Sequence, residues 1–327
     1  MGRRFGLASV VSVLSLCAAV STGIAADPPD KPEGKAEQRL EDVTVQATHL
    51  DEKALSHAVI NFVDSHAAPN GRSGLIGRWT QNVCPFAEGL KPAFNQYVTD
   101  RIMQVVKSVG APNGHSPKGC LANVVIVFTD HPQATLDDLA KNYHVLLGYY
   151  DPSQEQKVVS FSRPIQAWYL TGTRSFAGGY LSQLAPMKGT GVTQDLPIGM
   201  HLDTDPGPAP GGAPGSYFGD SRRSEFQHVT IIVDSRAVTS YPLASVADYV
   251  AVLALTRMTS LDGCNPLPSI IDLLAADCPI RAGVDALTAA DKAYLRALYS
   301  SNLERNLNIA QADVRNRLMQ EMSSGGR

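Results

Sequence analysis

Three residues near the middle of the chain, His201, Asp203 and Asp205, have the types and spacing that could hold a metal ion. They alternate along the sequence, so on an extended segment their side chains would point to the same side. Imidazole nitrogens and carboxylate oxygens bind divalent cations, and a bound cation can activate water for hydrolysis. His228 could join them if the intervening Gly- and Pro-rich segment folds back. The same residues also suit an exposed polar arm of a hairpin, and the sequence favours that interpretation.

The motifs of two common hydrolase classes do not occur in this sequence. It contains neither the His-Glu-x-x-His motif of zinc peptidases nor its inverted form, and no Gly-x-Ser-x-Gly motif. The other histidines considered have no partner at a ligand spacing, so we expect each to be solvated or to cap a helix: His57, His66, His115, His131 and His144. The sequence therefore leans against an enzyme.

The N-terminus predicts export from the cytoplasm. Arg3 and Arg4 precede an apolar run, and small residues precede Asp27, an order typical of a signal peptide over 1–26. The charged, Pro-rich segment 27–41 is expected to be a flexible leader. The predicted location is secreted or periplasmic. A net charge of −3 argues against a nucleic-acid binder, and no later segment has the length and hydrophobicity of a membrane span.

Four cysteines remain in the exported chain, and an even number favours disulfides there. Sequence order suggests that Cys84 pairs with Cys120 and Cys264 with Cys278, although four cysteines allow three connectivities. The sequence therefore predicts a fold held together by two disulfides.

Helical and strand patterns alternate over the N-terminal part, 42–171, which favours an α+β or α/β arrangement. Thr135 and Asp138 have the spacing of a capping box. The expected helices are 51–64, 93–109 and 132–143, and the expected strands are 75–79, 123–128, 146–149 and 158–169, with a loop beginning at Cys84-Pro85. The Gly- and Pro-rich region 172–224 is expected to be a long loop.

The C-terminal part, 225–322, contains an expected strand at 228–233 and then the apolar run 246–255. This run is too short to span a bilayer, so it predicts a core helix covered by protein. Ser245 and Asp248 have a capping spacing at its start. A second capped helix is expected from Leu287, and the amphipathic tail 303–322 is expected to pack on the body or to self-associate.

The pattern from Val229 to Tyr299 resembles the zincin-like metallopeptidase fold, and in particular secreted bacterial proteins in which the zinc site is lost. The resemblance implies an edge strand, then 246–255 in the place of the zinc-binding helix, and then a closing helix. Asp248 would stand for the first histidine, Tyr249 for the glutamate and Val252 for the second histidine. Valine has no lone pair for a metal, so the resemblance implies a protein without zinc peptidase chemistry.

These observations give an α+β fold with a mixed sheet packed with helices, a zincin-like C-terminal lobe and two disulfides. The first functional hypothesis is a secreted or periplasmic, non-catalytic protein with a binding or structural role in the envelope, without a cofactor and with an envelope protein or peptide as partner. The alternative is a metal-dependent hydrolase that uses a divalent metal at His201, Asp203, Asp205 and His228.

Overall fold

The computed structural model describes residues 52–71, 73–114, 120–148, 159–175, 222–261, 264–275, 278, 284–304 and 306–324. These residues belong to one compact unit, Leu50–Arg327. The expected signal peptide, the leader 27–41 and most of the loop region 172–224 lie outside the described residues.

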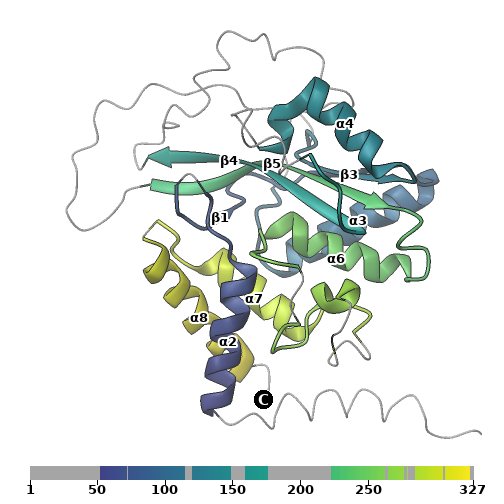
Figure 1. Ribbon diagram of the computed structural model, residues 1–327. Helices are drawn as coiled ribbons and strands as arrows, with labels where there is room; N and C mark the ends of the chain where they lie inside the picture. Colours follow the sequence, from purple (N-terminus) through teal and green to yellow (C-terminus); the bar gives the residue numbers. More distant parts are fainter. Residues whose placement is uncertain are drawn as a thin grey trace, which may run out of the picture. The chain divides into compact units, whose positions relative to one another are not determined.

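A mixed sheet forms the centre of the fold, as the sequence predicted (Figure 1). Strand β3 (Val124–Thr129) pairs in parallel with β2 (Pro85–Glu88) on one side and with β5 (Arg222–Asp234) on the other. Strand β4 (Ile165–Ser175) runs antiparallel along almost the whole of β5, and the two-residue strand β1 (Gly77–Arg78) pairs in parallel with the start of β5. Strand β5 is therefore an interior strand with neighbours on both sides.

Helices cover both faces of this sheet; Figure 1 shows α4 (Pro132–Tyr143) above the strands and α6 (Leu243–Leu255) below them. On the α6 face, side chains of β3 and β5 share one core with α6 and with α3 (Pro92–Ser108), the helix that connects β2 to β3. On the α4 face, Ile232 and Trp168 pack with Leu136. Parallel strands joined by crossover helices make the architecture α/β rather than α+β.

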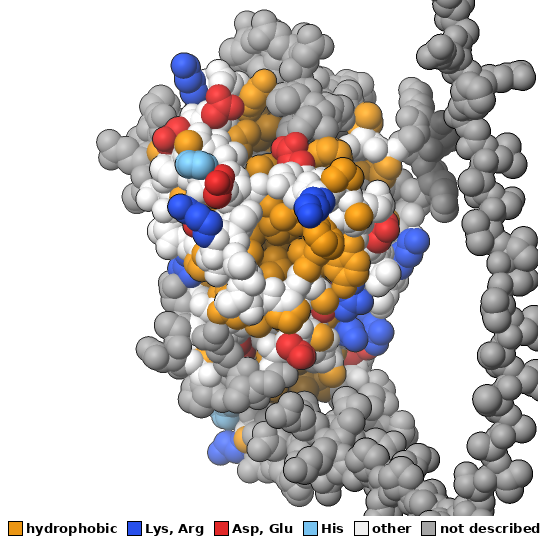
Figure 2. Space-filling view, turned by 90° about the vertical axis from the view of Figure 1, so that its right-hand side faces the viewer, with side chains coloured by type: hydrophobic (Ala, Val, Ile, Leu, Met, Phe, Trp, Pro, Cys, Tyr) orange, Lys and Arg blue, Asp and Glu red, His pale blue; other side chains and the backbone are white. Residues whose placement is uncertain are grey.

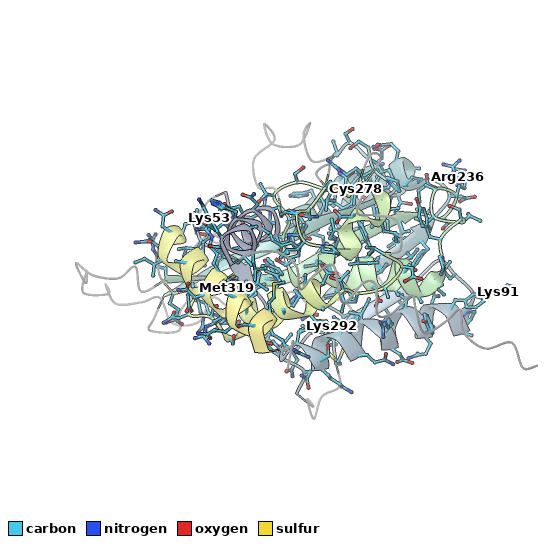
Figure 3. All side chains as sticks on the ribbon, turned by 90° about the horizontal axis from the view of Figure 1, so that it is seen from below. Lys53, Lys91, Arg236, Cys278, Lys292 and Met319 are labelled. Carbon is cyan, nitrogen blue, oxygen red and sulfur yellow. A yellow bond between two sulfur atoms is a disulfide. The ribbon has the colours of Figure 1, made fainter. Side chains whose placement is uncertain are left out.

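The other helices close the α6 side of the sheet. They are α2 (Glu52–His66), α7 (Ala289–Ser300) and α8 (Leu307–Ser324). Helix α8 contacts both α7 and α2, and its residues Ala310, Val314 and Leu318 are buried. Figure 3 places Lys53 of α2 and Met319 of α8 at the same end of the molecule. The amphipathic C-terminal tail therefore packs on the body, as its apolar stripe predicted.

Both expected disulfides are present, Cys84–Cys120 and Cys264–Cys278. The first lies beside the start of β2 and β3, where the backbone N–H of Cys84 donates to Oδ1 of Asn123 at 2.8 Å. The second closes the segment that contains the short 3-10 helix η4 (Ile270–Leu274). Each disulfide thus restrains a loop that lies next to a helix or strand of the core.

Several local expectations were wrong. Residues 146–148 of the expected strand 146–149 are not a strand, because His144–Leu147 is a 3-10 helix, η1, which Gly148 ends with φ of 73°. A short apolar run does not distinguish a strand from a buried helical turn. Pro85 begins strand β2 rather than a loop. The helix expected at 132–143 is confirmed as α4, but the capping box expected from Thr135 and Asp138 does not form, because Thr135 lies inside the helix and His131 is its N-cap residue.

Candidate functional site

The helix that the resemblance equates with the zinc-binding helix is α6, and it begins earlier than the capping pattern predicted. Pro242 is its N-cap residue, so Ser245 and Asp248 lie inside the helix. The Ser245 hydroxyl donates to the backbone carbonyl of Asp285. Because Pro242 fixes its own φ and Leu243 starts the helix, the capping box expected from Ser245 and Asp248 does not form.

Asp248 is the central polar residue of this helix, with only 1% of its surface exposed. Arg101 of α3 donates from Nε to Oδ1 at 2.6 Å and from Nη2 to Oδ2 at 2.9 Å. The backbone N–H of Leu287, just before α7, also donates to Oδ2 at 2.8 Å. The hydrogen bonds to Asp248 raise the pKa of Arg101. The carboxylate therefore joins α3, α6 and the start of α7 and has its charge paired.

The other two positions that the resemblance singled out, Tyr249 and Val252, are also buried. Beyond them, three aromatic residues donate to carbonyl groups at the C-terminal end of α6. Trp79 Nε1 bonds the Ala254 carbonyl at 2.7 Å, and the Tyr299 hydroxyl bonds that of Leu255 at 3.0 Å. The Tyr169 hydroxyl bonds Leu253 at 2.8 Å and Thr256 at 3.0 Å. Helix α6 is therefore enclosed by protein at its middle and at its C-terminal end.

His66 contradicts the expectation of a solvated or capping histidine, because it is fully buried. Its Nδ1 lies 2.8 Å from the Phe62 carbonyl oxygen, and its Nε2 lies 3.4 Å from Ser269 Oγ. Burial lowers the pKa of His66 to about 3. The Ser269 hydroxyl donates to Asp291 Oδ1 at 2.6 Å. Serine, histidine and aspartate thus meet here.

This group lacks the arrangement needed for nucleophilic catalysis. A catalytic serine transfers its proton to a histidine that an aspartate orients, whereas Ser269 donates directly to Asp291. Ser269 is also fully buried and caps η4. Asp291 forms a capping box with Thr288 at the start of α7, as the sequence predicted. We therefore assign the group to stabilising the contact between α2, the disulfide segment and α7.

His228, the fourth candidate metal ligand, lies on β5 and is fully buried. In the described part of the chain neither of its ring nitrogens has a hydrogen-bond partner, and burial lowers its pKa to about 4. The other candidates, His201, Asp203 and Asp205, lie outside the described residues. Within the described ranges, no group of three or more His, Cys, Asp or Glu side chains has the placement to hold a metal ion.

A buried carboxylate that the sequence analysis missed is Glu225, near the start of β5. Arg174 of β4 donates to its Oε1 at 2.6 Å, and Thr80 donates to its Oε2 at 2.5 Å. Nearby, Arg78 donates to the carbonyls of the last turn of α7, and burial lowers its pKa. Single charged residues in strands carry no local signal of such pairing, so only the tertiary structure reveals it.

The end of the sheet at which the parallel strands finish has an apolar surface. Figure 2 looks onto this end, the right-hand side of Figure 1, and shows hydrophobic side chains gathered around a hollow with charged groups at its margin. Figure 3 places Lys91 and Arg236 at the same end. Phe94 and Tyr97, in the first turns of α3, are 50% and 43% exposed.

Among the described residues, no helix combines the length and hydrophobicity that crossing a membrane requires. Comparison of the chain with protein-family models, with curated proteins and with solved structures found no match.

Proposed function

We propose that this protein is an exported, zincin-like protein that acts by binding, or as a structural component, in the cell envelope without a catalytic zinc ion. The observation that carries the proposal is the pairing of Asp248 with Arg101 and with the Leu287 backbone. Where the resemblance would require a zinc ligand, the chain has a carboxylate that already accepts three hydrogen bonds. One turn later it has Val252, which has no donor atom for a metal.

Three further observations support the proposal and one counts against the resemblance. The signal-peptide pattern and the two closed disulfides suit an oxidising compartment outside the cytoplasm. The enclosed α6 suits a scaffold helix, so a protein or peptide partner would bind elsewhere on the surface. The departure is that β5 is an interior strand, whereas the resemblance implied an edge strand before the helix.

The proposal is tested on the mature protein prepared from the exported fraction. N-terminal sequencing is expected to begin near Asp27, and the protein is expected to stay folded and free of stoichiometric zinc after exposure to zinc and dialysis. The matched control is Arg101→Gln, which removes the arginine paired with the Asp248 carboxylate and so shows whether that carboxylate binds zinc once it is unpaired. Zinc that is bound by the wild type and lost in Asp248→Asn, together with peptide hydrolysis, would refute the proposal.

A second candidate, a metal-dependent hydrolase, is favoured by the state of His228. A histidine must be neutral to bind a metal, and the His228 ring is held neutral by burial with both nitrogens unpartnered in the described structure. In this candidate His201, Asp203 and Asp205 supply the remaining ligands. Stoichiometric zinc or manganese that disappears in both His201→Ala and His228→Ala, with loss of a hydrolytic activity, would support it.

A further inference from the structure

Among the described residues, the side chains of Gln227, His228 and Thr230 on strand β5 have buried polar atoms without a hydrogen-bond partner. His228 is fully buried and Thr230 is 2% exposed. Within the described part of the chain, neither ring nitrogen of His228, nor Thr230 Oγ1, nor Gln227 Nε2 has a partner. Buried polar groups in native proteins are almost always paired with protein or with ordered water, so a cluster of this kind calls for an occupant.

A β-bulge places these groups on the same face of β5. The pairing of β4 with β5 shifts between Leu170 and Thr171, so that Gln227 is the extra residue on β5. Val229 and Phe226 both belong to the core on the α6 side. Gln227 and His228 therefore lie on the opposite face, where Thr230, two residues beyond His228, lies as well.

Apolar and closely packed groups surround this cluster. Across the strand pair, His228 lies opposite Leu170 and Thr230 lies opposite Trp168, and both opposing residues are buried. The turn after η1 approaches β4 so closely that a Cβ atom on Gly148 would come within 2.2 Å of the Tyr169 carbonyl oxygen. Bulk water is therefore excluded from the unpartnered groups.

From this arrangement we infer that Gln227, His228 and Thr230 form an internal binding site for ordered water. A neutral imidazole offers one donor and one acceptor, a threonine hydroxyl offers both, and the glutamine amide nitrogen offers donors. A buried water needs two to four such partners. The low pKa of His228 is consistent with an uncharged site.

An ion suits this site less well than water does. The carboxylate nearest in sequence on the same strand, Glu225, is already bonded by Arg174 and Thr80. A cation bound at His228 would therefore lose its hydration shell, and that carboxylate would not be free to neutralise its charge. A metal ion would take the lone pair of the unprotonated ring nitrogen of His228, so it would displace a water that donates to that nitrogen. At that nitrogen the inference competes with the hydrolase candidate.

The test combines NMR of the mature protein with two substitutions. Imidazole ¹⁵N spectra are expected to show a neutral His228 in one tautomer, with magnetisation transfer from a long-lived water to the ring and to the Thr230 hydroxyl. His228→Phe is expected to increase the unfolding equilibrium constant about tenfold, because it leaves the water and its other partners underbonded. His228→Gln, which keeps a donor and an acceptor, is expected to lose less stability.

Two results would overturn the inference. If the site is dry, His228→Phe will raise the melting temperature, because the substitution removes an unpartnered polar ring, and no water signal will reach the ring. If the site is a metal site, titration with zinc chloride will shift the His228 nitrogens with a stoichiometric endpoint. Should His228→Phe fail to fold, Thr230→Val provides the same contrast with a side chain of equal shape.

Discussion

Arg101 and Asp248 are 147 residues apart in the sequence, yet two charge-assisted hydrogen bonds join them between α3 and α6. The two side chains differ in their surroundings: that of Arg101 is 31% exposed, and that of Asp248 is 1% exposed. The consequences of breaking the pair are therefore unequal, because only one partner can be hydrated after the other is removed.

We expect Arg101→Gln to lower the free energy of unfolding by about 3 kcal/mol, because it leaves the buried Asp248 carboxylate without its counter-ion. Asp248→Asn is expected to cost less, about 1–2 kcal/mol, since Arg101 can turn to solvent. Urea denaturation of both variants measures the difference. Arg236→Gln, at an exposed arginine beside Asp234, is the control and is expected to change stability by less than about 1 kcal/mol. Equal losses of unfolding free energy in Arg101→Gln and Asp248→Asn would contradict this account.

Acid is expected to destabilise the protein through His66. Its pKa is lowered from 6.5 to about 3 in the folded state, so as the pH falls below 6.5 the unfolded chain takes up the proton first. Stability attributable to this group is therefore complete above pH 6.5 and decreases by about 1.4 kcal/mol for each pH unit down to pH 3. His66→Gln should flatten this slope in urea titrations at several pH values.

The buried carboxyls beside His66 act in the opposite direction. Burial raises the pKa values of Asp272 and Asp291, so their contribution decreases as the pH rises above 3.8. The informative quantity is therefore the difference between wild type and His66→Gln at each pH. His57→Gln, at an exposed position of the same helix, is the control. An unchanged pH slope in His66→Gln would show that His66 does not titrate with unfolding.

Replacing Cys264 and Cys278 by serine should cost about 3 kcal/mol, the loop-closure value for a separation of 14 residues. The disulfide also holds Asn265, whose Nδ2 donates to Asp272 Oδ1 at 2.7 Å. Asn265→Ala is therefore expected to cost less in the serine background than in the oxidised protein. A double-mutant cycle from urea denaturation measures this coupling, and strict additivity would contradict it.

The aromatic donors at the end of α6 should each contribute to stability. Tyr169→Phe and Tyr299→Phe remove hydroxyls that bond α6 carbonyls, and each is expected to cost about 1 kcal/mol. Tyr97→Phe, on the exposed surface of α3, is the matched control and should be neutral. Thermal unfolding provides the measurement. Equal melting temperatures for all three variants would show that the Tyr169 and Tyr299 hydroxyls do not stabilise the fold.

Gly110 and Gly148 allow a contrast between backbone strain and crowding, since both have φ of 73°. A Cβ atom at Gly110 would meet nothing within 4 Å, whereas one at Gly148 would approach the Tyr169 carbonyl oxygen. Gly110→Ala is expected to cost about 1 kcal/mol through strain alone. Gly148→Ala is expected to cost about 3 kcal/mol or more, measured by urea denaturation, because the close approach of η1 to β4 is lost as well. Similar costs at both positions would show that crowding at Gly148 is relieved by small shifts.

Local patterns predicted most of the elements, because hydrophobic periodicity and terminal residues act within a few positions. The helix beginning after Thr288 and the buried strand β3 follow directly from such signals. The same reasoning failed at Ser245, where a correct capping spacing occurs inside a helix that Pro242 had already started. A local pattern gives the spacing of two residues but does not give the start of the helix.

The candidate site was much less predictable, since its contacts join distant parts of the chain. The sequence identified Asp248 as a polar residue in an apolar run but gave no sign that Arg101 would reach it. It identified His66 only as one histidine among several, although Ser269 lies 203 residues away and meets its ring. Pairing across such separations depends on packing, and one sequence contains no record of it.

Helix α8 rests on α2, so the last helix of the described chain completes the burial of the first. Without α8, the part of α2 that it contacts loses cover. A chain truncated before Leu307 should therefore be more sensitive to proteolysis and more prone to aggregation than the full chain.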